Sequence, residues 1–345
     1  MLKLYICSPG VTIVLSNQLI NKLGNRDKMS QKFRLVTRSD FDGLVCAVLL
    51  NHLEMIDDIS FVHPKDMQDG KIEIGPNDIT TNLPYVETAH LVFDHHLSET
   101  LRNNKNLANH VIDSEAPSAA RIVWKHYGGE KTFPASWNDM MEAVDKADSA
   151  QYEREEVLNP KNWELLNFLM DSRTGLGRFR EFRISNYNLM MDLIEYCKDH
   201  SIAEILKLPD IKERVELYMS HQNQFREQIQ RCATVYENVV VLDLRDEEII
   251  YSGNRFMIYA LFPQCNISIH QMWGLKKQNT VLATGKSIFD RSCKTNIGEL
   301  MLKNGGGGHD AAGTCQVENG KADEALQELI AEIIANEGDS VRKAS

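Results

Sequence analysis

Short apolar segments in the first third of this sequence each end in polar residues, and helical patterns separate them. The segments have the length and composition of β-strands and cover residues 33–37, 59–62, 78–81, 90–93 and 109–113. Strands that alternate with helices favour a parallel sheet with helices on both faces. Ligands bind beyond the carboxyl ends of such strands, so we expect the polar residues at these ends to form a site.

The rest of the chain divides into a helical part and a second part with strand patterning. A long polar helix over 211–233 is interpreted as a connector. Strand patterns return at 239–244, 267–269, 281–284 and 314–317, and a last helix follows at 322–335. We therefore expect an α/β protein with an N-terminal parallel-sheet domain, a helical connector and a smaller C-terminal α/β domain.

The cysteine pattern and the charge exclude several classes of protein. The seven cysteines are odd in number, widely scattered and contain no CxxC, which favours reduced thiols in a cytoplasmic protein over a disulfide or zinc framework. The formal net charge of −11 disfavours binding to long duplex nucleic acid but is compatible with a small phosphorylated ligand in a local pocket. No segment approaches the ~18 apolar residues of a membrane span. A homodimer is one option for assembly.

Two motifs with acidic residues and histidines follow predicted strands. Asp40 and Asp42 lie between a strand and a helix, where two carboxylates can share a cation, although helix capping explains this motif alone equally well. Asp94, His95 and His96 end another strand, where one imidazole can bind metal and the other can contact phosphate or pass a proton. Oxygen and imidazole ligands suit Mn²⁺ or Mg²⁺. Together the motifs favour a metal site over surface decoration.

A run of four glycines at 305–308, followed by His309, marks the second part of the chain. Such a run lowers stability through backbone entropy, but it lets amide groups approach an anion closely. A flexible hinge is the alternative, which the preceding helical pattern and the small residues that follow disfavour. Arg291 is a candidate phosphate contact, because a guanidinium binds phosphate in a fork. The expected substrate-binding residues are Gly306, Gly307, Gly308, His309 and Arg291.

These three motifs, in this order, resemble the DHH phosphoesterase superfamily with its DHH-associated C-terminal domain. The resemblance covers about residues 33–320 and is strongest to the branch of nano-RNA hydrolases, pAp phosphatases and exopolyphosphatase-related proteins. It implies a two-domain enzyme with one or two Mn²⁺ ions, Mg²⁺ being the alternative. We therefore expect a metal-binding catalytic domain at 29–200, a helical connector at 201–235, a substrate-binding domain at 236–336 and a polar tail at 337–345. Residues 1–28 precede Met29 and the first strand pattern and are interpreted as an N-terminal extension.

The resemblance also assigns roles to single residues. Metal ligands would be Asp40, Asp42, Asp94, His95 and Asp148, with Asp145 as the alternative to Asp148, and the catalytic residues would be His96 and Asp94. Two positions depart from the family pattern: Val36 stands where a His is frequent, and Asn82 stands where a metal-bridging Asp is usual. His63 and Asp78 are candidate substitutes. These departures leave the number of ions open.

Three functions fit the sequence. The first is hydrolysis of very short oligonucleotides or 3′,5′-bisphosphorylated adenosine, the second is hydrolysis of polyphosphate or pyrophosphate, and the third is non-catalytic binding of a phosphorylated metabolite. Base-stacking aromatics would favour the first, but a protein core explains the candidates more simply. These candidates are Tyr251, Phe256, Tyr259 and Phe262. The segment 173–178 could add positive charge over a cleft, but we interpret it as a solvated loop.

Overall fold

The computed structural model describes residues 31–96, 107–179 and 181–343, so the expected extension at 1–28 lies outside the described residues. The strands are β1 (Phe33–Arg38), β2 (Ile56–Val62), β3 (Asp78–Thr81), β4 (Leu91–Asp94), β5 (His110–Ile112), β6 (Ala233–Tyr236), β7 (Val239–Asp243), β8 (Ile267–Trp273), β9 (Thr280–Lys286), β10 (Gly307–His309) and β11 (Ala312–Val317). The α-helices are α2 (Phe41–His52), α3 (Pro64–Gln68), α5 (Ala119–His126), α6 (Asn138–Asp148), α7 (Arg154–Leu158), α8 (Asn162–Met170), α9 (Asn186–Asp199), α10 (Ile202–Ile205), α11 (Pro209–Cys232), α12 (Met257–Leu261), α13 (Ile297–Lys303) and α14 (Ala322–Lys343). Short 3-10 helices are η1 (Gly129–Lys131), η2 (Ala135–Trp137), η3 (Ser172–Thr174), η4 (Leu176–Arg178), η5 (Leu275–Lys277) and η6 (Asn319–Lys321).

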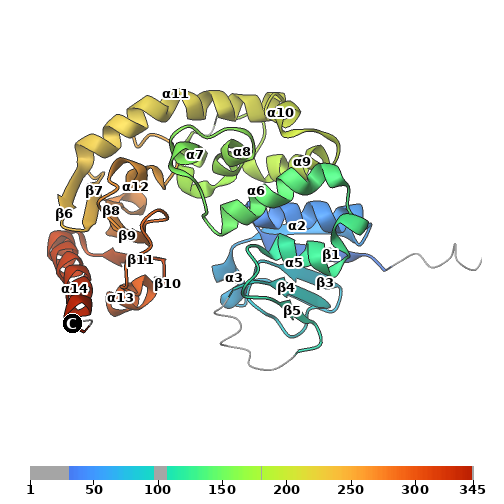
Figure 1. Ribbon diagram of the computed structural model, residues 1–345, viewed down its shortest axis with the longest axis horizontal. Coiled ribbons are helices and arrows are strands. Elements are labelled where there is room, and N and C mark those ends of the chain that lie inside the picture. Colours follow the sequence, from blue (N-terminus) through green and yellow to red (C-terminus); the bar gives the residue numbers. More distant parts are fainter. Residues whose placement is uncertain (1–30, 97–106, 180, 344–345) are drawn as a thin grey trace, which may run out of the picture.

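The first sheet is parallel, as predicted, with strand order β2-β1-β3-β4-β5 (Figure 1). Its side chains alternate between two cores: Leu35 packs in the main cluster under α2, whereas Val36 packs with Met67 and Leu83 on the other face. Helix α2 contacts α5, α6 and α9. On the second face the described residues place the short helix α3, whose Met67 packs against Val36, together with neighbouring loops.

Three strands of this sheet end side by side. Thr37 of β1 pairs with Thr81 of β3, and Thr81 pairs with Phe93 of β4. The Thr81 hydroxyl donates to Oγ1 of Thr37 at 2.7 Å, which ties two of the strand ends together. The polar segments that follow β1, β3 and β4 therefore leave the sheet at one edge, as the sequence predicted.

The second sheet is mixed and confirms the expected smaller α/β part. Its strand order is β10-β11-β9-β8-β7-β6, with β7 and β8 parallel. Helices α13 and α14 pack on one face, where they bury Ile267, Ile269 and Leu282. Helix α14 continues to Lys343, beyond the predicted end of the last helix at residue 335.

The glycine run, expected to bring amide groups close to an anion, is divided between a turn and a strand. Gly307 to His309 form edge strand β10, which pairs antiparallel with β11. Gly305 has a φ of +73°, which ends α13, and a Cβ on Gly308 would lie 2.3 Å from the Ala312 carbonyl oxygen. Part of the glycine content therefore serves a tight turn and a close strand contact.

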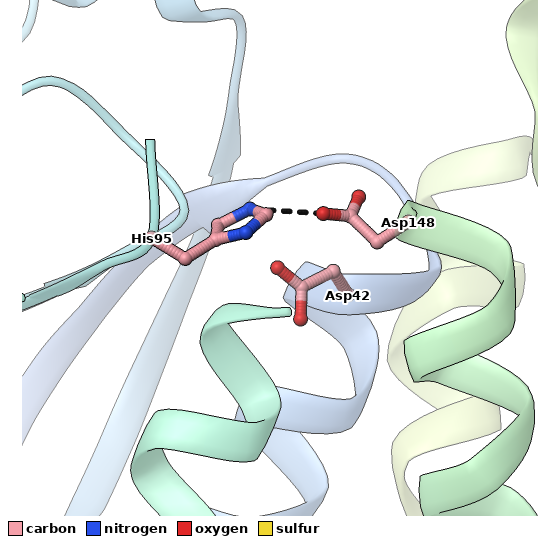
Figure 2. Close-up of side chains that lie close together, drawn as sticks. All are labelled: Asp42, His95 and Asp148. Carbon is pink, nitrogen blue, oxygen red and sulfur yellow. Dashed lines mark ion pairs between the residues drawn. The ribbon is translucent and has the colours of Figure 1, made fainter. Parts of the chain in front are cut away.

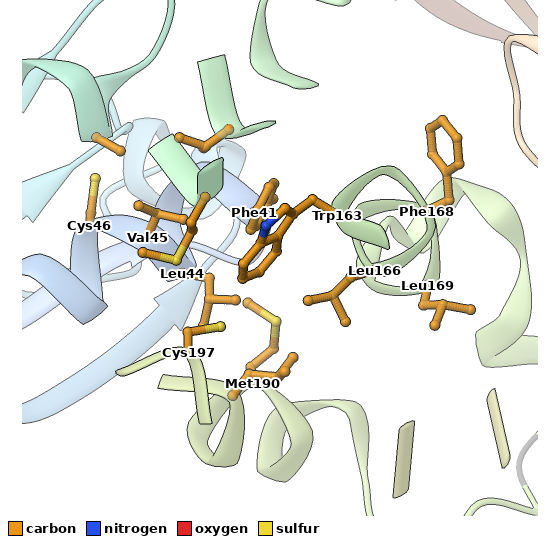
Figure 3. Packing of buried hydrophobic residues seen from close by; sticks show 14 of the residues in the cluster. Phe41, Leu44, Val45, Cys46, Trp163, Leu166, Phe168, Leu169, Met190 and Cys197 are labelled. Carbon is orange, nitrogen blue, oxygen red and sulfur yellow. The ribbon is translucent and has the colours of Figure 1, made fainter. Parts of the chain in front are cut away.

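Helix α11 arches from the first part of the molecule to the second, as expected of a connector (Figure 1). The two parts also share one hydrophobic cluster, because Met257 of α12 belongs to the same buried cluster as Leu44 of α2. Near its centre Phe41 stacks on Trp163 with ring centroids 5.8 Å apart, beside Met190 (Figure 3). This continuous core holds the second sheet at a defined position relative to the first.

Two further findings concern the predicted cellular setting. The structure describes six of the cysteines, and all six are free thiols. Within the described residues, no helix is at once long enough and apolar enough to cross a membrane.

Candidate functional site

Three predicted side chains meet at the carboxyl edge of the first sheet. Asp42 in the first turn of α2, His95 after β4 and Asp148 at the end of α6 each offer one ligand atom, and these atoms lie within 4.8 Å of one another (Figure 2). Nε2 of His95 lies 2.9 Å from Oδ2 of Asp148. In the described part of the chain, no other group of His, Cys, Asp or Glu side chains meets this spacing. One imidazole and two carboxylates form a donor set that suits a divalent cation.

The N-terminus of α5 orients Asp42. Oδ2 of Asp42 accepts from the Ala119 amide at 3.0 Å, and Oδ1 accepts from the Ala120 amide at 2.8 Å. Amides in a first helical turn lack intrahelical partners and carry the positive end of the helix dipole. Burial and the charges of Asp148 and Asp40 nevertheless raise the pKa of Asp42 well above its usual range. The carboxylate is held in place but needs further positive charge to stay ionised.

His95 faces acceptors with both ring nitrogens. Nδ1 lies 3.3 Å from the Ala116 carbonyl oxygen, and Nε2 faces Asp148. Burial would lower the pKa of His95, but the hydrogen bond and charge of Asp148, helped by Asp42, outweigh it and raise this pKa to about 9. A cation that replaced the Nε2 proton would leave the Nδ1 contact with Ala116 intact, and this contact fixes the ring.

The buried carboxylate of Asp94 gives an independent indication that the site suits a cation. Its Oδ2 has no hydrogen-bond donor among the described residues, although the side chain is fully buried. A buried polar atom without a partner costs about 1–3 kcal/mol, and more if it is charged. Asp94, an expected ligand, lies outside the group of three, but its unpartnered oxygen and buried Asp42 beside Asp148 leave uncompensated negative charge at this edge, which a divalent ion would offset.

Asp94 also positions the second histidine. Its Oδ1 lies 2.7 Å from Nδ1 of His96 and accepts from the backbone amide of His95 at 2.9 Å. Because an ionised carboxylate only accepts, Nδ1 of His96 carries a proton. Nε2 is then the nitrogen that His96 can offer to a substrate, and the side chain is 35% exposed.

Asp40 lies outside the three-residue group because other side chains hold it. Nε of Arg38 lies 2.9 Å from its Oδ2, and Nδ2 of Asn82 donates to its Oδ1 at 3.3 Å. Asp40 also caps α2 by accepting from the Gly43 amide at 3.0 Å, so the capping interpretation applies to this residue. Asn82 has a φ of 54°, a left-handed conformation in which Asn is enriched.

Several other candidates lie outside the group of three. Asp145, the alternative last ligand, accepts from Nε of Arg121 at 2.7 Å. His63 caps α3, and Asp78 at the start of β3 pairs with Nε of Arg34 at 2.8 Å. None of these side chains contributes to the group.

The predicted substrate-binding residues lie on the second part of the chain. Arg291 reaches across to the first part, where its Nη2 donates to the Ser149 and Ala150 carbonyls at 3.2 and 3.0 Å, directly after Asp148. The glycines and His309 form β10 at the edge of the second sheet. Arg291 thus lies beside the centre, although carbonyl oxygens already bind part of its guanidinium.

The interpretation of the segment 173–178 as a solvated loop is only partly right. Arg173 and Arg178 are exposed, but the segment forms η3 and η4, and Thr174 is buried with its carbonyl accepting from the Gly253 amide at 3.0 Å. The negative charges of nearby carboxylates, among them Asp40, raise the pKa of Arg173. The basic residues of this segment and Arg38, two residues before Asp40, were the signal that could have revealed cations at the site.

The aromatic candidates are mostly core residues, as the simpler interpretation held. Phe256 and Tyr259 are buried, and the Tyr259 hydroxyl lies 2.8 Å from Oγ of Ser268. They are not available as base-stacking platforms.

Comparison with known proteins gives one relative of high identity. A pGpG-specific phosphodiesterase from Vibrio cholerae, PggH, is 67% identical to this chain, and the match covers 88% of this chain and 100% of that protein with a TM-score of 0.79. RecJ from Thermus thermophilus in complex with Mn²⁺ is 13% identical to this chain, and the match covers 95% of this chain and 56% of the RecJ chain with a TM-score of 0.50. This likeness shows a shared fold alone. No protein-family model and no curated protein matches the sequence.

Proposed function

The chain belongs to the DHH superfamily of phosphoesterases and hydrolyses phosphoester bonds in small phosphorylated substrates, and from this premise we propose that its substrate is the guanine dinucleotide pGpG. The observation that carries the proposal is the 67% identity to a pGpG-specific phosphodiesterase over that protein's full length. Hydrolysis of the internal phosphodiester would release two molecules of guanosine monophosphate.

We assign the divalent ion to Asp42, His95 and Asp148, and we propose Mn²⁺ or Mg²⁺ as its identity. When bound, such an ion neutralises charge on phosphoryl oxygens and makes water a better acid. The amides of α5 support this assignment, because they aim the Asp42 carboxylate.

His96 acts on the reacting phosphate in this proposal, and Asp94 is its positioning residue. The bond from Nδ1 of His96 to Asp94 keeps one proton at Nδ1, so Nε2 can take a proton or donate one to an oxygen of the phosphodiester. The imidazolium form of His96 would also offset charge on the phosphoryl group.

We further propose one ion per chain. Asp40, an expected ligand, is paired with Arg38 and accepts from Asn82, so a guanidinium already supplies positive charge at this carboxylate. Arg38 then acts as the second positive group beside the phosphodiester, opposite the ion.

The other expected properties also stay proposals. They are the domain divisions at 29–200, 201–235 and 236–336, phosphate contacts by Arg291 and β10, a cytoplasmic location and a homodimer. The free thiols support the cytoplasmic location.

The test is turnover of a substrate panel by the purified chain with Mn²⁺ or Mg²⁺. The panel contains pGpG, 3′,5′-bisphosphorylated adenosine, cyclic di-GMP, polyphosphate and pyrophosphate. We expect pGpG to give the highest kcat/KM and Asp42→Asn to abolish turnover, whereas Asp66→Asn, which changes an exposed carboxylate on α3, should not affect it. Preferred hydrolysis of polyphosphate or pyrophosphate would favour the second function, and pGpG binding without turnover would favour the non-catalytic one.

A further inference from the structure

Two arginines far apart in the sequence share one carboxylate. Nε of Arg173 in η3 donates to Oδ1 of Asp171 at 2.7 Å, and Nε of Arg255, just before α12, lies 3.6 Å from Oδ2 of the same side chain. The Gly253 amide donates to the Thr174 carbonyl at 3.0 Å and joins the two segments. Two guanidinium groups and one carboxylate leave one net positive charge at this position.

These arginines continue a row of cations that begins at the candidate metal centre. Arg38 contacts Asp40 directly at 2.9 Å. Arg173 is next in the row, because the negative charges of Asp171 and Asp40 both raise its pKa. Arg255 follows, since among the neighbouring charges those of Arg173 and Asp171 have the largest effects on its pKa. Positive charge therefore extends away from the metal centre toward the second part of the chain.

Arg255 is the least satisfied member of the row. Its Nε is buried and has no hydrogen-bond partner among the described residues. Its guanidinium lies over the Phe256 ring, 4.0 Å from the centroid. Burial and the like charge of Arg173 lower the pKa of Arg255 to about 10. An anion would relieve the repulsion between the two guanidinium groups, and a stacked guanidinium keeps its donor edge open to an oxyanion.

We propose that Arg173 and Arg255 bind the terminal 5′-phosphate of a dinucleotide whose internal phosphodiester lies at the metal centre. This inference rests on the proposed function and adds the feature by which the substrate is selected. A 5′-phosphorylated dinucleotide carries two phosphates one nucleotide apart, and the row offers Arg38 to the first and the arginine pair to the second. Arg291 stays a candidate for a further phosphate contact, although its Nη2 already donates to two carbonyl oxygens.

The proposal also accounts for selection by length. After Arg255 the chain continues into buried Phe256 and Tyr259, which offer no further positive charge, so in this proposal the arginine pair marks the end of the substrate site. Dinucleotides without a terminal phosphate, and cyclic dinucleotides, offer no group of two negative charges to the arginine pair.

The experiment compares pGpG with GpG, which lacks the terminal phosphate. We expect the unaltered chain to hydrolyse pGpG with a kcat/KM about 10- to 100-fold above that for GpG, in line with one or two charge-assisted phosphate bonds. In Arg255→Gln the ratio of the two values should fall toward 1, mainly through KM for pGpG, and Arg255→Lys should restore part of it. Arg231→Gln, which removes an α11 guanidinium paired with Glu247, is the matched control and should keep the ratio.

A second measurement does not depend on turnover. Guanosine monophosphate should bind the chain more tightly than guanosine, and Arg173→Gln or Arg255→Gln should remove that difference, as measured by calorimetry. Equal kcat/KM for pGpG and GpG in the unaltered chain, or an equal loss for both in folded Arg255→Gln, would overturn the subsite while leaving the proposed function intact. Hydrolysis of neither dinucleotide would instead refute the proposed function and the subsite with it.

Discussion

Metal affinity at the candidate centre should rise steeply with pH, because His95 must lose a proton to become a ligand. Burial opposes protonation of His95, but its hydrogen bond to Asp148 and the negative charge of that carboxylate prevail and raise the pKa of His95 to about 9. At pH 7 only about 1% of the chains then carry neutral His95, and each pH unit up to the pKa changes that fraction about tenfold. Between pH 7 and 8.5 the apparent Kd for Mn²⁺ should fall by about 25-fold.

Protonation of Asp42 should make the dependence of metal affinity on pH steeper. Burial and the charge of Asp148 raise its pKa well above the usual range, so a proton on this carboxylate also competes with the metal. We therefore expect between one and two protons to be released for each ion bound.

Isothermal titration of Mn²⁺ measures both quantities. Two buffers with different ionisation enthalpies give the number of protons released at each pH, and the Kd follows from the same curves. His96→Gln is the matched control, because His96 is adjacent in sequence but lies outside the group of three and should keep the pH dependence. A pH-independent Kd, or no proton release, would refute the assignment of His95 as a ligand.

Three further outcomes test the site and the fold. Atomic emission on Mn²⁺-loaded, dialysed protein should find one ion per chain, and two ions would contradict the pairing of Arg38 with Asp40 as the replacement of a second cation. Arg38→Gln should lower kcat by about 100-fold with that ion still bound, as for other lost electrostatic contacts to a transition state, and unchanged turnover would refute its role. Asp78→Asn should lower the free energy of unfolding in urea by about 2 kcal/mol without affecting turnover. Hydrogen bonds from Arg34 and Gly75 outweigh burial and lower the pKa of Asp78, so its contribution should be present above pH 4 and vanish on acidification; an acid-independent difference from the variant would contradict this.

The first sheet was predictable because its signals are local. Each strand is a short apolar segment that ends in polar residues, and parallel pairing then brings Asp40, Asn82 and Asp94 to one edge without further information. The strand in the glycine run was not predictable for the opposite reason. Gly307, Gly308 and His309 have low strand propensity, and they form β10 because β11 supplies their hydrogen-bond partners.

The ligand set was predictable in type but not in detail. The motifs and the family resemblance pointed to Asp42, His95 and Asp148, yet they gave no means of separating these from Asp40, which has the same chemistry. The separation comes from two kinds of contact. The α5 amides that aim Asp42 are distant in the chain, whereas the guanidinium of Arg38 on Asp40 is only two residues away but depends on the direction that both side chains take in the fold. Such contacts depend on tertiary packing, which a single sequence does not specify locally.

One departure from the family pattern, Asn82, agrees with a count of the charges at the site. The edge of the first sheet and the row of arginines contain five carboxylates and three guanidinium groups, namely Asp40, Asp42, Asp94, Asp148, Asp171, Arg38, Arg173 and Arg255. With neutral His95 and ionised carboxylates these groups leave two negative charges, which one divalent ion cancels. Asn82 in place of a carboxylate removes one negative charge, and Arg38 on Asp40 offsets another. Together they equal the charge of one divalent ion, so a second ion would leave the site with uncompensated positive charge before any substrate bound.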